Sequence, residues 1–94
     1  MLKACEGAFL EADLAILSAA ISDYRPANPA SHKMKKTGDS LTIALVENPD
    51  VLFTLGQKKK ETQLLVGFAL ETNDELENAQ KKLKKKQLDF IVLN

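Results

Sequence analysis

The sequence of 94 residues predicts an α/β domain, in which a parallel sheet is flanked by helices and carries a small β-hairpin. Residues 14–20, 64–70 and 88–93 are short apolar runs without polar alternation, as is typical of strands buried on both faces of a parallel sheet. Segments with helical spacing or helix-start signals precede and separate these runs. Strands that alternate with helices indicate βαβ units.

Composition and charge exclude several classes of protein. Hydrophobic residues make up 45% and charged residues 28%, which favours a folded domain over a disordered chain. Thirteen Lys and Arg balance thirteen Asp and Glu, which argues against a general nucleic-acid or membrane-surface binder. With only Cys5 and His32, the chain has neither a disulfide framework nor a Cys/His metal site. No apolar run spans a bilayer and no signal peptide is evident, so we expect a cytoplasmic protein.

The first half predicts a helix, a strand and a hairpin. In residues 1–11 the apolar positions recur at helical spacing and form one face. After the apolar run 14–20 comes a polar loop, which leads to three lysines in the pattern K-x-K-K. Residues 37–40 (TGDS) are a turn signal between 34–36 and 41–46, so we expect a hairpin with the lysines on its first arm. On such an arm Lys33 and Lys35 would share one face and Lys36 would point away.

The second half predicts two helices and two strands. Asn48 is expected to be the N-cap of a helix with Pro49 at its first position and Asp50 favourable near its positive end, running to about residue 58. After the run 64–70, residues 72–75 begin another helix that ends near residue 86. Within it Glu77 and Lys81 are spaced for an i, i+4 pair.

Ligands of parallel sheets bind beyond the carboxyl ends of the strands, which here are residues 18–25, 68–73 and Asn94. The lysines of the K-x-K-K motif suit a phosphate or a developing anion, or alternatively protect a hairpin edge from pairing. Asp23 is suited to hold magnesium or to accept a hydrogen bond from a base amino group, or alternatively caps its own loop.

Three further features leave a binding and a structural interpretation open. Lys82 and Lys86 share one helical face, which can meet a nucleotide or remain a solvated face near the helix C-terminus. The helix start at 48–52 offers free amides to an anion, or only begins a helix. Phe68 can stack on a base or belong to the core. The four glycines form no phosphate-binding fingerprint, so such a loop is absent or lies outside this chain.

The motifs AAISDYRP, K-x-K-K, LTIALVENPDVL and VGFALET occur in this order, followed by a lysine-rich helix and LDFIVLN. In this arrangement, over nearly its whole length, the chain resembles the phosphopantothenate–cysteine ligase family. The resemblance implies a Rossmann-like fold and a homodimer formed through the hairpin region. It also implies CTP and magnesium, which activate 4′-phosphopantothenate as an acyl-cytidylate that cysteine converts to 4′-phosphopantothenoylcysteine. FMN is implied only where the full-length protein carries a decarboxylase domain.

The resemblance implies nucleotide-binding roles for residues at five places in the chain, and no metal ligand. These residues are Leu17, Ser18, Ala19, Asp23, Lys33, Pro49, Asp50, Val51, Leu52, Phe68, Lys82 and Lys86. Lys33 is also implied to be catalytic, stabilising charge on the reacting phosphate.

The chain departs from the family in lacking its glycine-rich phosphate motif, its asparagine for cysteine transfer and the segment after the last strand. We therefore expect residues 1–94 to be the central and C-terminal-side part of a ligase domain, inactive alone. Two alternatives stay open: a non-catalytic α/β nucleotide-binding or dimerisation module, and half of an NAD(P)-dependent reductase. The missing dinucleotide fingerprint counts against the reductase.

Overall fold

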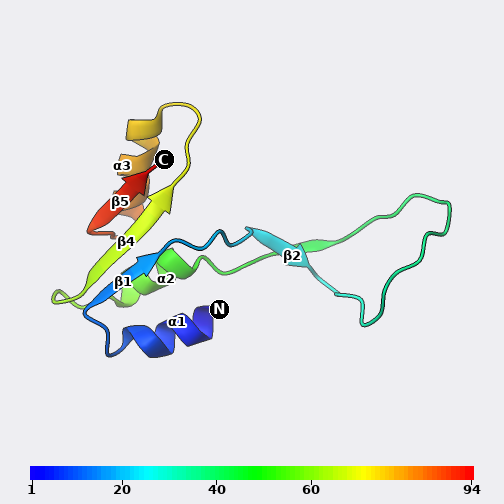
Figure 1. Ribbon diagram of the computed structural model, residues 1–94, viewed down its shortest axis with the longest axis horizontal. Helices are drawn as coiled ribbons and strands as arrows, with labels where there is room; N and C mark the ends of the chain where they lie inside the picture. Colours follow the sequence, from blue (N-terminus) through cyan, green and yellow to red (C-terminus); the bar gives the residue numbers. More distant parts are fainter.

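The computed structural model describes residues 1–94, and its centre is a three-stranded parallel sheet in the order β1-β4-β5 (Figure 1). The strands of this sheet are β1 (Leu14–Leu17), β4 (Leu64–Ala69) and β5 (Phe90–Leu93). The helices are α1 (Leu2–Phe9), α2 (Val51–Lys58) and α3 (Glu75–Lys85). A separate antiparallel pair is formed by β2 (Tyr24–Pro26) and β3 (Leu45–Glu47). This architecture confirms the predicted α/β class, with a parallel sheet, flanking helices and a small hairpin.

The connections place the helices on one face of the sheet. Helix α2 joins β1 to β4 and α3 joins β4 to β5, so both crossovers advance in the same direction across the sheet. Right-handed crossovers that advance in one direction leave their helices on the same side. Helix α1 packs against α2 on that side.

The hydrophobic core lies between this helical layer and the sheet. Its buried members come from α1, α2, β4 and the turn after α3: Phe9, Val51, Leu55, Leu65 and Leu88. Because side chains alternate along a strand, Leu65, Gly67 and Ala69 of β4 all point into this layer. Leu65 is fully buried at the centre of the sheet.

The opposite face of the sheet is exposed and apolar. Its side chains alternate with those of the core and come from all three strands: Leu14, Ile16, Leu64, Phe68, Phe90 and Val92. The prediction that these strands are buried on both faces is therefore wrong for this chain. The physical reason is that the described residues place all three helices on the other face.

The hairpin forms closer to the body of the domain than predicted. Strand β3 overlaps the predicted second arm, but the predicted first arm at residues 34–36 is wrong, because Tyr24–Pro26 takes that role. Hydrogen bonds at the base, from Asn48 N to Asp23 O (2.7 Å) and from Arg25 Nη1 to Glu47 O (2.9 Å), hold the pair there. Further out, an isolated two-stranded ribbon has no core to stabilise it.

Residues 27–44, which we call the arm, extend away from the body of the domain (Figure 1). The radius of gyration is 17.1 Å, whereas a compact chain of this length would have about 12 Å. The arm carries the K-x-K-K lysines and exposed apolar side chains such as Met34, Leu41 and Ile43.

Helix α2 begins later than predicted. Asp50, with an extended backbone, is its N-cap, and the Asp50 carboxylate accepts a hydrogen bond from Phe53 N at 3.0 Å. The prediction that Asn48 caps this helix with Pro49 in its first turn is wrong, because the Asn48 side chain is engaged in the preceding loop. The predicted pair of Glu77 with Lys81 is confirmed at 3.2 Å.

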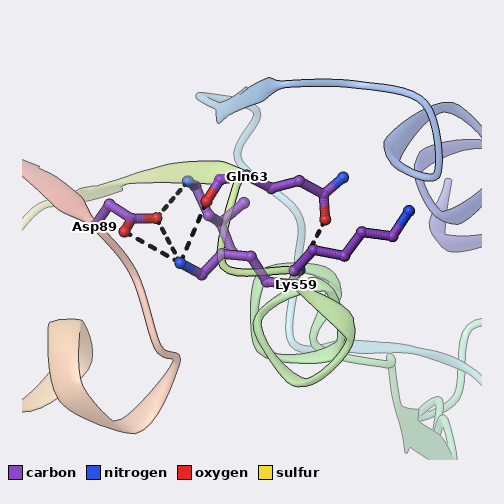
Figure 2. A network of polar contacts seen from close by, with 5 residues as sticks. Lys59, Gln63 and Asp89 are labelled. Atoms are coloured by element: carbon purple, nitrogen blue, oxygen red, sulfur yellow. Dashed lines mark hydrogen bonds and ion pairs between the residues drawn. The ribbon is translucent and has the colours of Figure 1, made fainter.

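A polar network joins the chain segments at the amino ends of the strands (Figure 2). Lys59 Nζ lies 2.9 Å from one Asp89 carboxylate oxygen, and the same oxygen accepts from Leu65 N at 2.8 Å. The buried Gln63 donates from Nε2 to Phe9 O (2.6 Å) and Ala12 O (2.9 Å). The network therefore fastens α1, α2, β4 and β5 at one end of the sheet.

Helix α3 ends in a Schellman motif without glycine. Gln87 N donates to Lys84 O (3.2 Å), Leu88 N donates to Leu83 O (2.9 Å), and Leu83 packs on the core beside Leu88. Gln87 has a φ of 55°, which lies in the left-handed region. We expect Gln87→Gly to raise the free energy of unfolding by about 1 kcal/mol, because glycine adopts this conformation without steric cost. Urea denaturation checks this, and an unchanged or lower midpoint would contradict it.

No helix of the chain combines the length and the apolar character needed to cross a bilayer.

Candidate functional site

A cleft of about 450 Å³ lies at the carboxyl edge of the sheet. Its walls are the end of β1 with the segment that follows it, residues 47–52 leading into α2, Phe68 of β4, and Lys86 at the end of α3. This is the edge at which parallel α/β sheets bind ligands, because the loops and helix N-termini converge there. The cleft mixes apolar side chains with a few polar and charged ones, as small-molecule sites do.

Asn48 fixes the two backbone segments that form one wall of the cleft. Its Nδ2 donates to Ser22 O at 2.8 Å, and its Oδ1 accepts from Arg25 Nη1 at 3.0 Å. Asn48 N also donates to Asp23 O at 2.7 Å. The segment after β1 and the segment before α2 are thereby held side by side, which places Asp23 and the start of α2 in the same cleft.

Asp50 and Lys86 form an ion pair in the cleft wall, with 3.1 Å between Lys86 Nζ and Asp50 Oδ2. The Lys86 side chain is only 22% exposed. Burial raises the pKa of the Asp50 carboxyl, but the hydrogen bond from Phe53 N and the contact with Lys86, with Lys85 nearby, together hold that pKa below its ordinary value. Asp50 is therefore ionised at neutral pH, and its carboxylate holds the Lys86 ammonium group at the start of α2.

The amides at the start of α2 offer hydrogen-bond donors beside this ion pair. The first N–H groups of a helix lack intrahelical partners, and they carry the positive end of the helix dipole. Val51 and Leu52 occupy the first two positions of α2 and line the cleft. An anion such as a phosphate in the cleft would meet these amides together with Lys86.

A second lysine of α3 is held outside the cleft lining. Lys82 Nζ lies 2.6 Å from Glu71 Oε1, and this carboxylate belongs to the segment after β4. Asn78 Nδ2 approaches the other Glu71 oxygen at 3.5 Å and donates to Asn73 O at 3.0 Å. Lys82 thus lies at the carboxyl edge of the sheet, but its charge is paired with Glu71.

The structure brings together most of the residues expected at a nucleotide site. Those that line the cleft are Leu17, Ala19, Asp23, Pro49, Asp50, Val51, Leu52, Phe68 and Lys86. Ser18 lines a neighbouring apolar cavity between α1 and β1 instead. Lys33 lies on the arm and is not part of the cleft lining.

Sequence reasoning missed several parts of the cleft. Tyr24 and Glu47, which pair with each other across the base of the ribbon, both line it, and so does Ser22. The bridging role of Asn48 was hidden because an Asn before Pro is also a common helix-start signal. The signal in the sequence that could have indicated the base of the ribbon is the polar residues that flank the arm on both sides.

The residues present do not form a metal site of their own. No group of three or more His, Cys, Asp or Glu side chains is placed to hold an ion. A magnesium ion would need oxygen ligands from a bound phosphate or from another chain.

The fold and the cleft define a parallel α/β domain with a candidate ligand site at the carboxyl edge of its sheet. Comparison with known families shows which one it is. The family described as "DNA/pantothenate metabolism flavoprotein C-terminal domain" matches residues 1–94, and the chain belongs to this family.

Relatives and a solved structure agree with this assignment. A "Cysteine/Cysteine sulfinic acid decarboxylase" from an unknown prokaryotic organism is 49% identical over 94 residues, which is all of this chain and 26% of that protein. The "Coenzyme A biosynthesis bifunctional protein CoaBC" of Bacillus subtilis (strain 168) is 49% identical over 82 residues, covering 87% of this chain and 20% of that protein. The same protein of Vibrio vulnificus (strain YJ016) is 45% identical over 84 residues, covering 87% and 21%.

A crystal structure of the C-terminal domain of CoaBC superposes with a TM-score of 0.77 at 37% identity. The matched region covers 96% of this chain and 40% of the chain in the solved structure. The chain thus spans about a fifth to a quarter of the length of the curated relatives it matches.

Proposed function

We propose that this chain supplies the nucleotide-binding part of a phosphopantothenate–cysteine ligase that acts in coenzyme A biosynthesis and uses CTP. The family, and relatives whose names state a role in coenzyme A biosynthesis, support this proposal. The observation that carries it is the cleft. Residues from the end of β1, the start of α2, β4 and the end of α3, which resemble nucleotide-binding positions, converge there.

The proposed reaction has two transfers. A carboxylate oxygen of 4′-phosphopantothenate attacks the α-phosphorus of CTP, pyrophosphate leaves, and an acyl-cytidylate forms. The amine of cysteine then attacks the acyl carbon, CMP leaves with the electron pair of the broken C–O bond, and the amine loses a proton. Activation is required because a free carboxylate oxygen is a poor leaving group, whereas CMP is a good one.

Each part of the cleft suits one part of the nucleotide. Lys86 and the amides of Val51 and Leu52 offer positive charge and donors to phosphate oxygens. Phe68 and Leu17 provide an apolar surface for the base. Asp23 offers a carboxylate that can accept from the amino group of cytosine. Such groups would hold the phosphate where charge develops in the transition state.

The arm carries the remaining catalytic candidate. Lys33 lies beyond the base of the ribbon, on a segment that extends away from its own cleft (Figure 1). We propose that the protein is a homodimer through this hairpin region, and that Lys33 acts at the reacting phosphate of the assembled site. The exposed Met34, Leu41 and Ile43 support an interface on the arm, because apolar side chains are otherwise costly there. Magnesium would arrive with the triphosphate, and FMN would belong to a decarboxylase domain, if the full-length protein has one.

Nucleotide selectivity tests the proposal. Calorimetric titration of this chain with CTP and with ATP, both with magnesium, should show tighter binding of CTP. Lys33→Ala and Lys86→Ala should each weaken CTP binding by about tenfold, because each removes one charge-assisted contact to phosphate. Lys60→Ala, which removes a lysine at the opposite end of the sheet, is the control and should bind as the parent chain does.

Equal binding of CTP and ATP would favour the alternative, a non-catalytic nucleotide-binding module. No binding by a folded chain, together with a dimer that the arm holds together, would favour a dimerisation module. Either result would count against the ligase proposal for this part of the protein.

A further inference from the structure

Helix α2 comes very close to the end of helix α3 at Gly56. This glycine is buried in α2, and a Cβ built there would lie 1.9 Å from Lys86 O and 2.9 Å from Lys86 C. Contacts under 3.0 Å are essentially never seen for real Cβ atoms. Since the clash is with backbone, no side-chain rotation relieves it, and only glycine fits unless α3 moves. Glycine costs a helix about 1 kcal/mol relative to alanine, so helix propensity does not explain its presence.

The backbone of Lys86 is fixed from its other side as well. It lies between α3 and the Schellman turn, in which Gln87 N donates to Lys84 O (3.2 Å) and Leu88 N donates to Leu83 O (2.9 Å). Leu88 is anchored in the core. The backbone of Lys86 is thus confined between Leu88 in the core and the surface of α2 at Gly56. This position determines which part of α2 the Lys86 side chain can reach.

From this position the Lys86 side chain extends to the start of the same helix that Gly56 belongs to. Its ammonium lies 3.1 Å from the Asp50 carboxylate and lines the cleft. Gly56 therefore sets how closely the Lys86 backbone approaches α2. That distance in turn sets the position of the Lys86 ammonium group, which lies beside the Asp50 carboxylate.

We propose that Gly56 is a positioning residue of the cleft: by lacking a side chain, it lets the Lys86 backbone contact α2 and so sets the lysine against the N-terminus of that helix. The inference rests on the proposed function only in that the ligand of the cleft is a nucleotide. Gly56 itself touches no ligand and acts through Lys86.

The test is a pH titration of Asp50 in the absence of nucleotide, in which the NMR chemical shift of its carboxyl carbon reports the pKa. Of the charged groups near Asp50, Lys86 makes the direct contact and Lys85 acts at longer range. Lys86→Gln should raise the pKa of Asp50 and thus measures the full effect of the lysine. Gly56→Ala should raise it by most of that amount, and the double variant should show no additional shift.

Gly67→Ala is the matched control. A Cβ at Gly67 would meet the ends of two flexible side chains, Leu52 Cδ2 at 2.6 Å and Leu88 Cδ1 at 3.1 Å, rather than backbone. These side-chain ends can rotate away, and no backbone atom of Lys86 is among the nearest contacts, so the pKa of Asp50 should stay at its parent value. If Gly56→Ala leaves that pKa unchanged, or shifts it equally with and without Lys86, the proposal is overturned.

Two further measurements complete the test. If Gly56→Ala does not fold, Gly56→Ala is made in the Gln87→Gly background and compared with Gln87→Gly alone, under the same criteria. CTP titration is then measured for the parent chain and Gly56→Ala, with a loss of about tenfold expected, as for Lys86→Ala. A shifted pKa of Asp50 with no CTP binding by the parent chain would leave the positioning role intact and count against the proposed function.

Discussion

Replacing Leu65 by alanine is expected to lower the free energy of unfolding by about 3–4 kcal/mol. Leu65 is fully buried on the central strand β4 and belongs to the small core that joins the sheet to α1 and α2. The substitution removes its apolar contacts and leaves a cavity that the backbone of a central strand cannot close. Urea denaturation followed by circular dichroism measures the effect.

Ile16→Ala is the matched control for this prediction. Ile16 lies on the neighbouring strand β1 but on the open face, where it is 58% exposed. The substitution deletes a similar aliphatic side chain with little loss of burial, so the free energy of unfolding should change by less than about 1 kcal/mol. Similar losses for the two variants would show that the open face is covered in solution and would contradict the description of a one-sided core.

Replacing Asp89 by alanine is expected to lower the free energy of unfolding by about 2 kcal/mol. The Asp89 carboxylate accepts from Leu65 N at 2.8 Å and pairs with the half-buried Lys59 at 2.9 Å. Its removal leaves the Leu65 amide of the central strand without its acceptor, and leaves the Lys59 ammonium group with only the Gln63 carbonyl oxygen at 3.3 Å and no counter-charge (Figure 2). Asp89→Asn is the control, because the amide oxygen can still accept from Leu65 N while the charge is lost, and its effect should be smaller.

The pH dependence of stability separates the two contributions of Asp89. The hydrogen bond from Lys59 Nζ, opposed by burial and assisted by Leu65 N, lowers the pKa of Asp89 from its ordinary value of 3.8. A carboxyl with a lowered pKa in the folded state stabilises the fold above its ordinary pKa, and that stability is lost as the pH falls through the folded value. The parent chain should therefore lose more stability than Asp89→Asn between neutral pH and about pH 3. Parallel profiles for the two proteins would contradict the assigned ion pair.

The sequence was sufficient for the order of the elements, because apolar runs and helix-start residues are local signals. It placed the strands 64–70 and 88–93 correctly to within about two residues, and the pair Glu77–Lys81 followed from helical spacing alone. The cleft was also predicted in outline, since the carboxyl ends of parallel strands must meet at one edge. Most residues chosen by resemblance line it.

The rest depends on partners distant in the sequence. Asn48 and Asp50 are both good N-cap residues, and only the hydrogen bonds of Asn48 with Ser22 and Arg25 decide that Asp50 takes the role. Similarly, residues 34–36 and 41–46 carry the signals of a hairpin, yet pairing forms only where the body of the domain supports it. The contact of Gly56 with Lys86 involves no local signal at all, because it arises from the docking of two helices.

The two ends of the sheet have different roles in the molecule. The Lys59–Gln63–Asp89 network lies at the amino ends of the strands, and the cleft lies at their carboxyl ends. Substitutions in the segments around the cleft can therefore change which ligand is recognised while the fastening at the far end preserves the fold. Such a separation makes a domain evolvable, because selection can revise its chemistry without first rebuilding its stability.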